Sequence, residues 1–200
     1  MNMTTMTSIP ATTDTELLRQ ARAGQAQAFA ALYRRHQAAL YRYALLRCGS
    51  ADTAADIVQE AFMGLLTGRL QFDPLRGQLL HFLFGVARLM VLKHEAPRQR
   101  QTALGSDEDG DSDLELASED GEPLARLLEN EAAEEVRRAL ALLPPHYRDA
   151  VILYEMHDLS YQEIAAVCQV DIGTVRSRLS RARAALAKRL ARYRSGASAA

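Results

Sequence analysis

The chain has 200 residues, of which 48% are hydrophobic, and a formal net charge of -1. This size suffices for one medium or two small domains of a globular protein. Ala, Leu, Arg, Gln and Glu predominate and Trp is absent, so the composition favours an all-α fold. The longest apolar stretch, residues 79–92, is too short to cross a bilayer, and we expect no membrane insertion.

The charge is unevenly distributed. Residues 107–122 include nine acidic side chains and no basic one, whereas residues 172–194 include eight Arg or Lys and no acid. Residues 101–123 combine mutually repelling acidic side chains with Gly and Ser residues and few large apolar side chains. Such a segment buries too little apolar surface to offset the entropy lost when a chain becomes ordered. We therefore expect an acidic flexible linker there, between domains of residues 14–100 and 124–194. Residues 1–13 and 195–200 are expected to be tails, and the Thr-rich N-terminus has no features of a secretory signal.

The N-terminal domain is predicted to be a bundle of four helices. Asp14 can cap the first, and Ser50 or Asp52 can start the third. Glycine ends the first three, and the Asp73-Pro74 pair makes a turn before the fourth. In chain order, the predicted helices cover residues 14–24, 28–49, 51–68 and 78–95, the last ending before Pro97.

A helix-turn-helix is predicted near the C-terminus. A helix over residues 125–142 and another beginning at Pro145 precede it. Ser160 and Glu163 form a capping box that fixes a helix start at Tyr161. After a turn at residues 169–171, in which Val170 is buried and Asp171 is the new cap, a second helix is expected. Its predicted buried row is Ile172, Val175, Leu179, Ala182 and Leu186.

The opposite face of this second helix is cationic and rich in hydroxyl groups. It consists of Thr174, Arg176, Ser177, Arg178, Ser180, Arg181 and Arg183. Arg side chains read guanine edges or bind phosphates, and a helix of this kind fits the major groove of DNA. A solvated face of an ordinary amphipathic helix is the alternative, but the capping box, the turn and the absence of acids favour DNA binding. The motif alone does not say which DNA-binding role the protein has.

Both predicted domains resemble the extracytoplasmic-function (ECF) group of the sigma-70 family of RNA polymerase sigma factors, the C-terminal one in one stretch and the N-terminal one in two. Residues 143–186, LPPHYRDAVILYEMHDLSYQEIAAVCQVDIGTVRSRLSRARAAL, resemble the domain that reads the minus-35 promoter element. Residues 51–66, ADTAADIVQEAFMGLL, resemble the helix that docks on core polymerase. Residues 72–88, FDPLRGQLLHFLFGVAR, resemble the loop and helix that engage the minus-10 element. The resemblance implies a sigma factor that directs core polymerase to specific promoters and initiates transcription.

The resemblance also implies site residues. Polymerase binding falls on Asp56, Gln59 and Glu60, and minus-35 binding on the cationic face of the second helix of the helix-turn-helix. The implied minus-10 residues are Phe72, Asp73, Arg76, Gln78, Arg88, Lys93 and Arg98. The chain departs from the family where an Asn, an Asp and a dense Arg run usually follow Arg88. It also has Gln169 where the turn usually has Gly, so this residue must adopt a left-handed conformation or shift the turn.

Other classes of function have less support. The histidines are dispersed, Cys48 and Cys168 are far apart, and no Gly-rich phosphate loop occurs, so we expect no metal, no cofactor and no enzymatic activity. The expected partners are core RNA polymerase and promoter DNA in the cytoplasm, and the sequence leaves open whether an anti-sigma factor also binds. A stand-alone helix-turn-helix regulator and a decoy that binds polymerase or an anti-sigma factor without initiating are the alternatives. The resemblance implies that, away from polymerase, the two domains fold together. The acidic linker is either a nucleic-acid mimic near the RNA exit path or a solvated spacer.

Overall fold

The computed structural model describes residues 12–102 and 133–197, with side chains for residues 12–95 and 133–191. Every regular element in these ranges is helical, which confirms the predicted all-α fold. Most of the predicted tails, the linker from residue 103 onward and the start of the helix predicted at residue 125 lie outside the described residues.

The N-terminal domain is the predicted helical bundle. Its elements are α1 (Asp14–Arg22), α2 (Ala26–Cys48), α3 (Ala51–Leu66), the 3-10 turn η1 (Pro74–Arg76) and α4 (Leu79–Thr102). Thr13 rather than Asp14 caps α1, because its hydroxyl accepts a hydrogen bond from the Glu16 backbone N–H at 3.3 Å. Gly49, with φ +72°, ends α2 as predicted, and Ser50 caps α3.

The prediction that Pro97 ends the fourth helix is wrong. Helix α4 continues to Thr102, so Pro97 and the first two residues of the predicted linker are helical. A proline inside a helix removes one N–H donor and strains the preceding turn, but its fixed φ near -65° is itself helical. Four turns of α4 that are already packed precede Pro97, and these let the helix continue past it.

The C-terminal domain comprises helical residues 133–141, α6 (Pro145–Glu155), α7 (Tyr161–Cys168) and α8 (Ile172–Ala197). Val175, Leu179 and Ala182 are buried, as predicted for α8. Ile172 is not, since 40% of it is exposed. Ile172 is the first residue of α8 and directly follows the turn. It therefore lies at the edge of the core, whereas Val175, Leu179 and Ala182 in the following turns of the helix lie over it.

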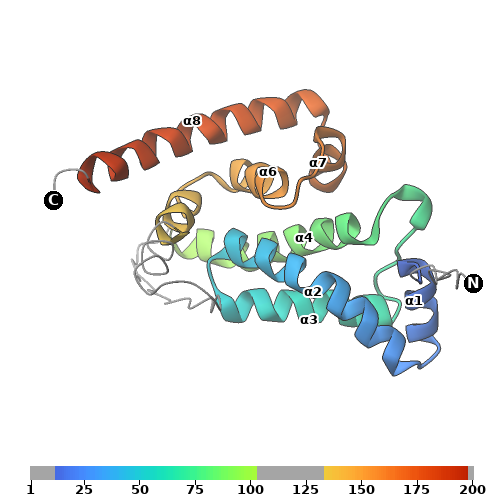
Figure 1. Ribbon diagram of the computed structural model, residues 1–200. Helices are drawn as coiled ribbons and strands as arrows, with labels where there is room; N and C mark the ends of the chain where they lie inside the picture. Colours follow the sequence, from blue (N-terminus) through green and yellow to red (C-terminus); the bar gives the residue numbers. More distant parts are fainter. Residues whose placement is uncertain (1–11, 103–132, 198–200) are drawn as a thin grey trace, which may run out of the picture.

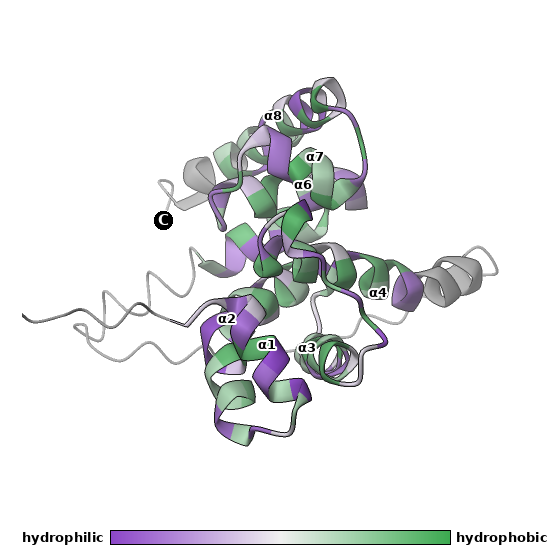
Figure 2. Ribbon diagram, turned by 90° about the vertical axis from the view of Figure 1, so that its right-hand side faces the viewer, coloured by the Kyte–Doolittle hydropathy of each residue, from purple (hydrophilic) through white to green (hydrophobic). Residues whose placement is uncertain are grey.

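The two domains pack directly on one another. Figures 1 and 2 show the C-terminal domain above α2 and α4, with α8 outermost on one side and α3 on the opposite side. Helix α6 contacts α2, and α7 contacts α4. Buried apolar residues of both domains form one continuous cluster, and in Figure 2 the hydrophobic colouring gathers where helices face one another. Domain association of this kind is what the resemblance implied for the chain on its own.

Candidate DNA and polymerase interfaces

Local hydrogen bonds fix the starts of both α7 and α8. Ser160 and Glu163 form the predicted capping box: the Ser160 N–H donates to the Glu163 carboxylate at 2.7 Å, and the Glu163 N–H donates to the Ser160 hydroxyl at 3.3 Å. These bonds lower the pKa of Glu163. Gln169 adopts the left-handed conformation, with φ +56°. Asp171 caps α8 by accepting from the Thr174 N–H at 2.8 Å, so α7 and α8 form the predicted helix-turn-helix.

Most of the predicted DNA-binding face of α8 is exposed. Arg176, Ser177, Ser180, Arg181 and Arg183 are exposed, and Thr174 is half-buried. Within the described residues, the Arg176 side chain makes no hydrogen bond or ion pair. Its guanidinium is therefore free to meet a base edge or a phosphate.

Two neighbouring arginines are already held by α6. Arg183 pairs with Glu155, with an Nη2 to Oε1 distance of 2.7 Å, and lies 4.7 Å from the centre of the Tyr154 ring. Arg181 donates to the Tyr147 hydroxyl at 3.3 Å. These contacts orient the outer side chains of α8 without burying them.

Arg178 differs from the rest of this face. It is half-buried, and its Nη1 atom is buried without a hydrogen-bond partner among the described residues. Burial, followed by the positive charge of Arg178, lowers the pKa of His146, which places the guanidinium on the α6 side of α8. Arg178 is thus positioned less directly for a DNA contact than Arg176.

The predicted polymerase-binding residues lie together on α3. Asp56, Gln59 and Glu60 are all exposed. Beside them, between α2 and α3, is an aromatic groove of about 470 Å³. Its lining residues are Phe29, Tyr33, Gln37, Tyr41, Ala55, Val58, Gln59, Phe62 and Met63. Sequence reasoning missed the exposed apolar members of this groove, although the position of Met63 four residues after Gln59 places both on the same face of α3.

The predicted minus-10 loop lies beneath the helix-turn-helix. Asp73 caps η1 by accepting from the Leu75 N–H at 3.0 Å, and this leaves Leu75 94% exposed at the tip. Phe72 packs on Phe82, with ring centres 5.7 Å apart. Phe72, Asp73, Arg76, Gln78 and Arg88 line a cavity of about 820 Å³, and residues of α7 close its other side. One of these is Glu163, whose carboxylate lies 3.7 Å from the His81 imidazole of α4.

The remaining predicted minus-10 residues lie along α4. Lys93 is exposed. Arg88 is only 15% exposed and pairs with Asp149 of the C-terminal domain. Arg98 lies in the last turns of α4, where the side chains are outside the described part of the chain.

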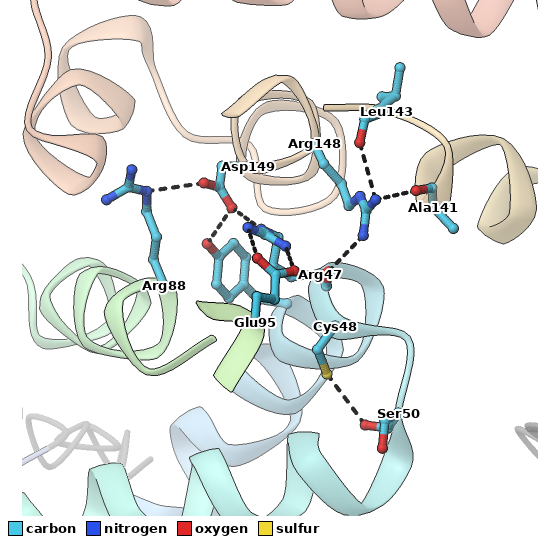
Figure 3. Close-up of polar contacts among 10 residues, drawn as sticks. Arg47, Cys48, Ser50, Arg88, Glu95, Ala141, Leu143, Arg148 and Asp149 are labelled. Atoms are coloured by element: carbon cyan, nitrogen blue, oxygen red, sulfur yellow. Dashed lines mark hydrogen bonds and ion pairs between the residues drawn. The ribbon is translucent and has the colours of Figure 1, made fainter. Parts of the chain in front are cut away.

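A buried charge cluster joins the two domains (Figure 3). The carboxylate of Asp149, 1% exposed, accepts from Arg47 at 2.6 Å, from Arg88 at 3.0 Å and from the Tyr43 hydroxyl at 3.1 Å. Arg47 is fully buried and also forms a two-bond pair with Glu95, at 2.5 and 2.9 Å. Burial alone lowers the pKa of Arg47, but Glu95 and Asp149 together raise it above its ordinary value.

A further arginine, Arg148 of α6, extends the same junction. Arg148 donates to the backbone carbonyls of Arg47, Leu143 and Ala141 (Figure 3). It thereby ties the end of α2 to the turn that precedes α6. Sequence reasoning missed Arg47, Arg148 and Asp149, because nothing local distinguishes them from the many solvated charges of the chain.

Comparison with known proteins identifies the family. Residues 32–100 match the model of sigma-70 region 2, and residues 133–186 match that of sigma-70 region 4. The ECF RNA polymerase sigma factor SigM of Mycobacterium tuberculosis is 33% identical over 92% of this chain and 87% of its own length. The chain belongs to the ECF sigma factors. SigE of Mycolicibacterium smegmatis is 32% identical over 82% of this ECF factor, which spans 62% of SigE.

A solved structure has a similar fold. It is the sigma factor RpoE of Bartonella quintana in complex with the anti-sigma factor NepR. The TM-score is 0.61 at 28% identity, over 76% of this ECF factor and 89% of RpoE. The two family regions lie within the two domains described above, so the cavity beside the predicted minus-10 loop and the Asp149 cluster lie between region 2 and region 4.

Two further observations concern other classes of site. In the part of the chain that the structure describes, no group of three or more His, Cys, Asp or Glu is placed to hold a metal ion. No helix within the same residues is both long enough and apolar enough to cross a membrane.

Proposed function

We propose that this ECF factor binds core polymerase and promoter DNA through two separate domains. Residues 14–100 would bind core polymerase and the minus-10 element, and residues 124–194 the minus-35 element. The observation that carries this proposal is the position of the exposed faces. Helices α3 and α8, which carry the exposed acidic and basic residues, lie on opposite sides of the molecule (Figure 1), so polymerase and upstream DNA can be bound at the same time.

Polymerase binding is assigned to Asp56, Gln59 and Glu60 together with the aromatic groove beside them. Exposed ion pairs contribute only about 0–1 kcal/mol each, so charge alone supplies too little affinity. Tyr33, 36% exposed, and Met63, 43% exposed, offer apolar surface at the centre of the same patch. A basic, partly apolar helical surface on polymerase is the partner that fits this combination.

DNA binding is assigned to two surfaces. The exposed residues of α8 would enter the major groove at the minus-35 element, led by Arg176. The loop of residues 72–78, with Arg88, Lys93 and Arg98 of α4, would hold the minus-10 element. The factor would act in the cytoplasm without a cofactor and without catalysing a reaction itself, since the chemistry belongs to polymerase.

An anti-sigma factor is a further proposed partner. The Bartonella quintana relative was solved in complex with one, and the fold of this chain is similar over most of both proteins. Such an inhibitor would act on the same two domains that bind polymerase and DNA.

The decisive test is transcription in a purified system. The full-length chain is added to core polymerase and a library of promoter fragments, and transcripts that depend on it are sequenced. Glu60→Lys should reduce core binding and transcripts together, whereas the matched change Glu16→Lys, on helix α1 and outside the residues assigned to polymerase, should leave both intact. Core binding without any transcript would establish the decoy. Specific DNA binding without core binding would establish the stand-alone regulator.

A further inference from the structure

Arg88 is the predicted minus-10 residue that the structure does not leave available. Its side chain is 15% exposed, and its Nε donates to Oδ2 of Asp149 at 3.0 Å. The other described residues of that set are more open: Asp73, Arg76, Gln78 and Lys93 are exposed, and Phe72 is half-buried. Domain packing therefore removes one particular cation from the surface assigned to DNA.

Asp149 is held entirely by the opposite domain. Its carboxylate accepts from Tyr43 and Arg47 of α2 and from Arg88 of α4. Within the described part of its own domain, its side chain has no hydrogen-bond partner. A carboxylate that is 1% exposed needs such partners, so it stabilises the packed arrangement and would lose all of them if the domains separated.

The two arginines that meet Asp149 are not equivalent. Arg47 has a second carboxylate, Glu95, in its own domain, which neutralises it whether or not the C-terminal domain is present. Arg88 makes no other ion pair with a described residue. Separation of the domains would therefore leave an uncompensated guanidinium on α4, beside the cavity that the minus-10 loop lines.

Carboxylate and phosphate present the same kind of oxygen acceptor to an arginine. We propose that Asp149 occupies the position of a DNA phosphate on Arg88, so that closure of the two domains and capture of the DNA backbone by α4 exclude one another. The inference rests on the proposed function in taking DNA as the competing ligand. Only open molecules can bind DNA through Arg88, so the apparent DNA affinity falls in proportion to the fraction of molecules that are open. Loss of Asp149 raises that fraction and restores the affinity.

The test uses the full-length chain and a fluorescent single-stranded DNA 20-mer of random sequence, because phosphate contacts are independent of sequence. Asp149→Asn keeps the shape of the side chain and removes its charge. Asp158→Asn is the matched control: the same change in the same domain, at an exposed residue whose φ of +54° Asn also tolerates. Small-angle X-ray scattering reports the radius of gyration without DNA, and fluorescence anisotropy at several salt concentrations reports affinity.

Asp149→Asn should increase the radius of gyration and tighten DNA binding by about 5-fold or more, the lower end of typical coupling between two sites. Asp158→Asn should match the wild type in both. Arg88→Ala should weaken binding and reduce the salt slope by about 0.7, the value for one phosphate contact on a single strand. In the Arg88→Ala background, Asp149→Asn should gain little, because the cation that it exposes is missing.

Wild-type scattering and affinity in Asp149→Asn would overturn the proposal. So would an expanded chain with unchanged affinity, or an equal gain in both backgrounds. If Asp149→Asn does not fold, Tyr43→Phe removes one donor to the same carboxylate and keeps the ring, and the same outcomes decide. Failure of the proposed function is distinguishable, since it appears as the absence of polymerase-dependent transcripts and leaves the closure measurements untouched.

Discussion

At the residue scale, partners decide which side chains of α8 can act on DNA. Arg176 is exposed and its side chain makes no hydrogen bond or ion pair with a described residue, whereas Arg183 is paired with Glu155 and Arg178 is half-buried. The sequence predicts the cationic face but does not rank its members, because the ranking depends on what α6 presents to each of them.

We expect Arg176→Ala to weaken binding of a minus-35 fragment by about 1–3 kcal/mol and to relax specificity at one base pair, as loss of a base contact does. Lys188→Ala is the control, since it removes the same charge from an exposed position farther along α8. Fluorescence anisotropy with a set of single-base variants of the fragment measures both effects. Equal losses in the two variants would show that Arg176 supplies only general positive charge.

His157 makes the packing of the domains sensitive to acid. It lies against Phe84 of α4, with ring centres 4.6 Å apart, and burial, followed by the charge of Arg42, lowers its pKa to about 4. Because the unfolded imidazole titrates near 6.5, protons bind the unfolded chain more readily between these two values. The stabilising contribution of neutral His157 is therefore complete above pH 6.5 and is lost as pH falls toward 4.

Thermal unfolding followed by circular dichroism at pH 7.5 and 5.5 tests this. His157→Phe keeps a ring against Phe84 and removes the titrating group, so its melting temperature should fall less on acidification than that of the wild type. The matching change at His94, an exposed histidine of α4, should keep the wild-type dependence. A wild-type dependence in His157→Phe as well would assign the effect to other groups.

At the scale of elements, capping residues were the most reliable guide to boundaries. Ser50, Gly49 and the Ser160–Glu163 box lie where local hydrogen bonding alone predicts them, because caps act within one turn. The boundary predicted from Pro97 was wrong because a helix end is not decided by local preference alone. The local preference of Pro97 against the helix interior is outweighed by tertiary packing of the preceding turns of α4.

Ser160→Ala removes the hydroxyl that caps α7 and should lower the free energy of unfolding by about 1 kcal/mol. Ser180→Ala, at an exposed position inside α8, caps nothing and should leave that free energy unchanged or slightly higher, because Ala favours helix. Urea denaturation followed by circular dichroism measures both. Ser160→Ala should have the lower free energy of unfolding of the two variants. The reverse order would contradict a stabilising role for the capping box.

At the scale of the whole molecule, the Asp149 cluster makes one folded unit of two domains. Removing one member of a buried ion pair typically costs about 3–5 kcal/mol, because its partner is left charged and unpaired. Arg47 has two such partners, Asp149 and Glu95, one in each domain. It is therefore the residue whose loss should affect the whole chain most.

Arg47→Met should lower the free energy of unfolding by about 3 kcal/mol and separate the unfolding of the two domains into two transitions. Arg34→Met is the matched control, since Arg34 is exposed on the same helix. Differential scanning calorimetry distinguishes one transition from two. A single transition at the wild-type temperature in Arg47→Met would mean that the buried cluster does not couple the domains.

The sequence by itself determined the all-α class, the helix-turn-helix, the cationic face of α8 and the acidic face of α3. Each depends on periodicity, capping or local charge, which act over a few residues of chain. Only the tertiary structure decided that Arg88 is paired, that Arg178 is half-buried, that Tyr33 and Met63 lie beside the acidic residues of α3, and that α7 and the predicted minus-10 loop line one cavity. The first of these features joins residues 61 positions apart, Arg88 and Asp149. No local pattern records such contacts, because they exist only once helices that are distant in the chain have packed.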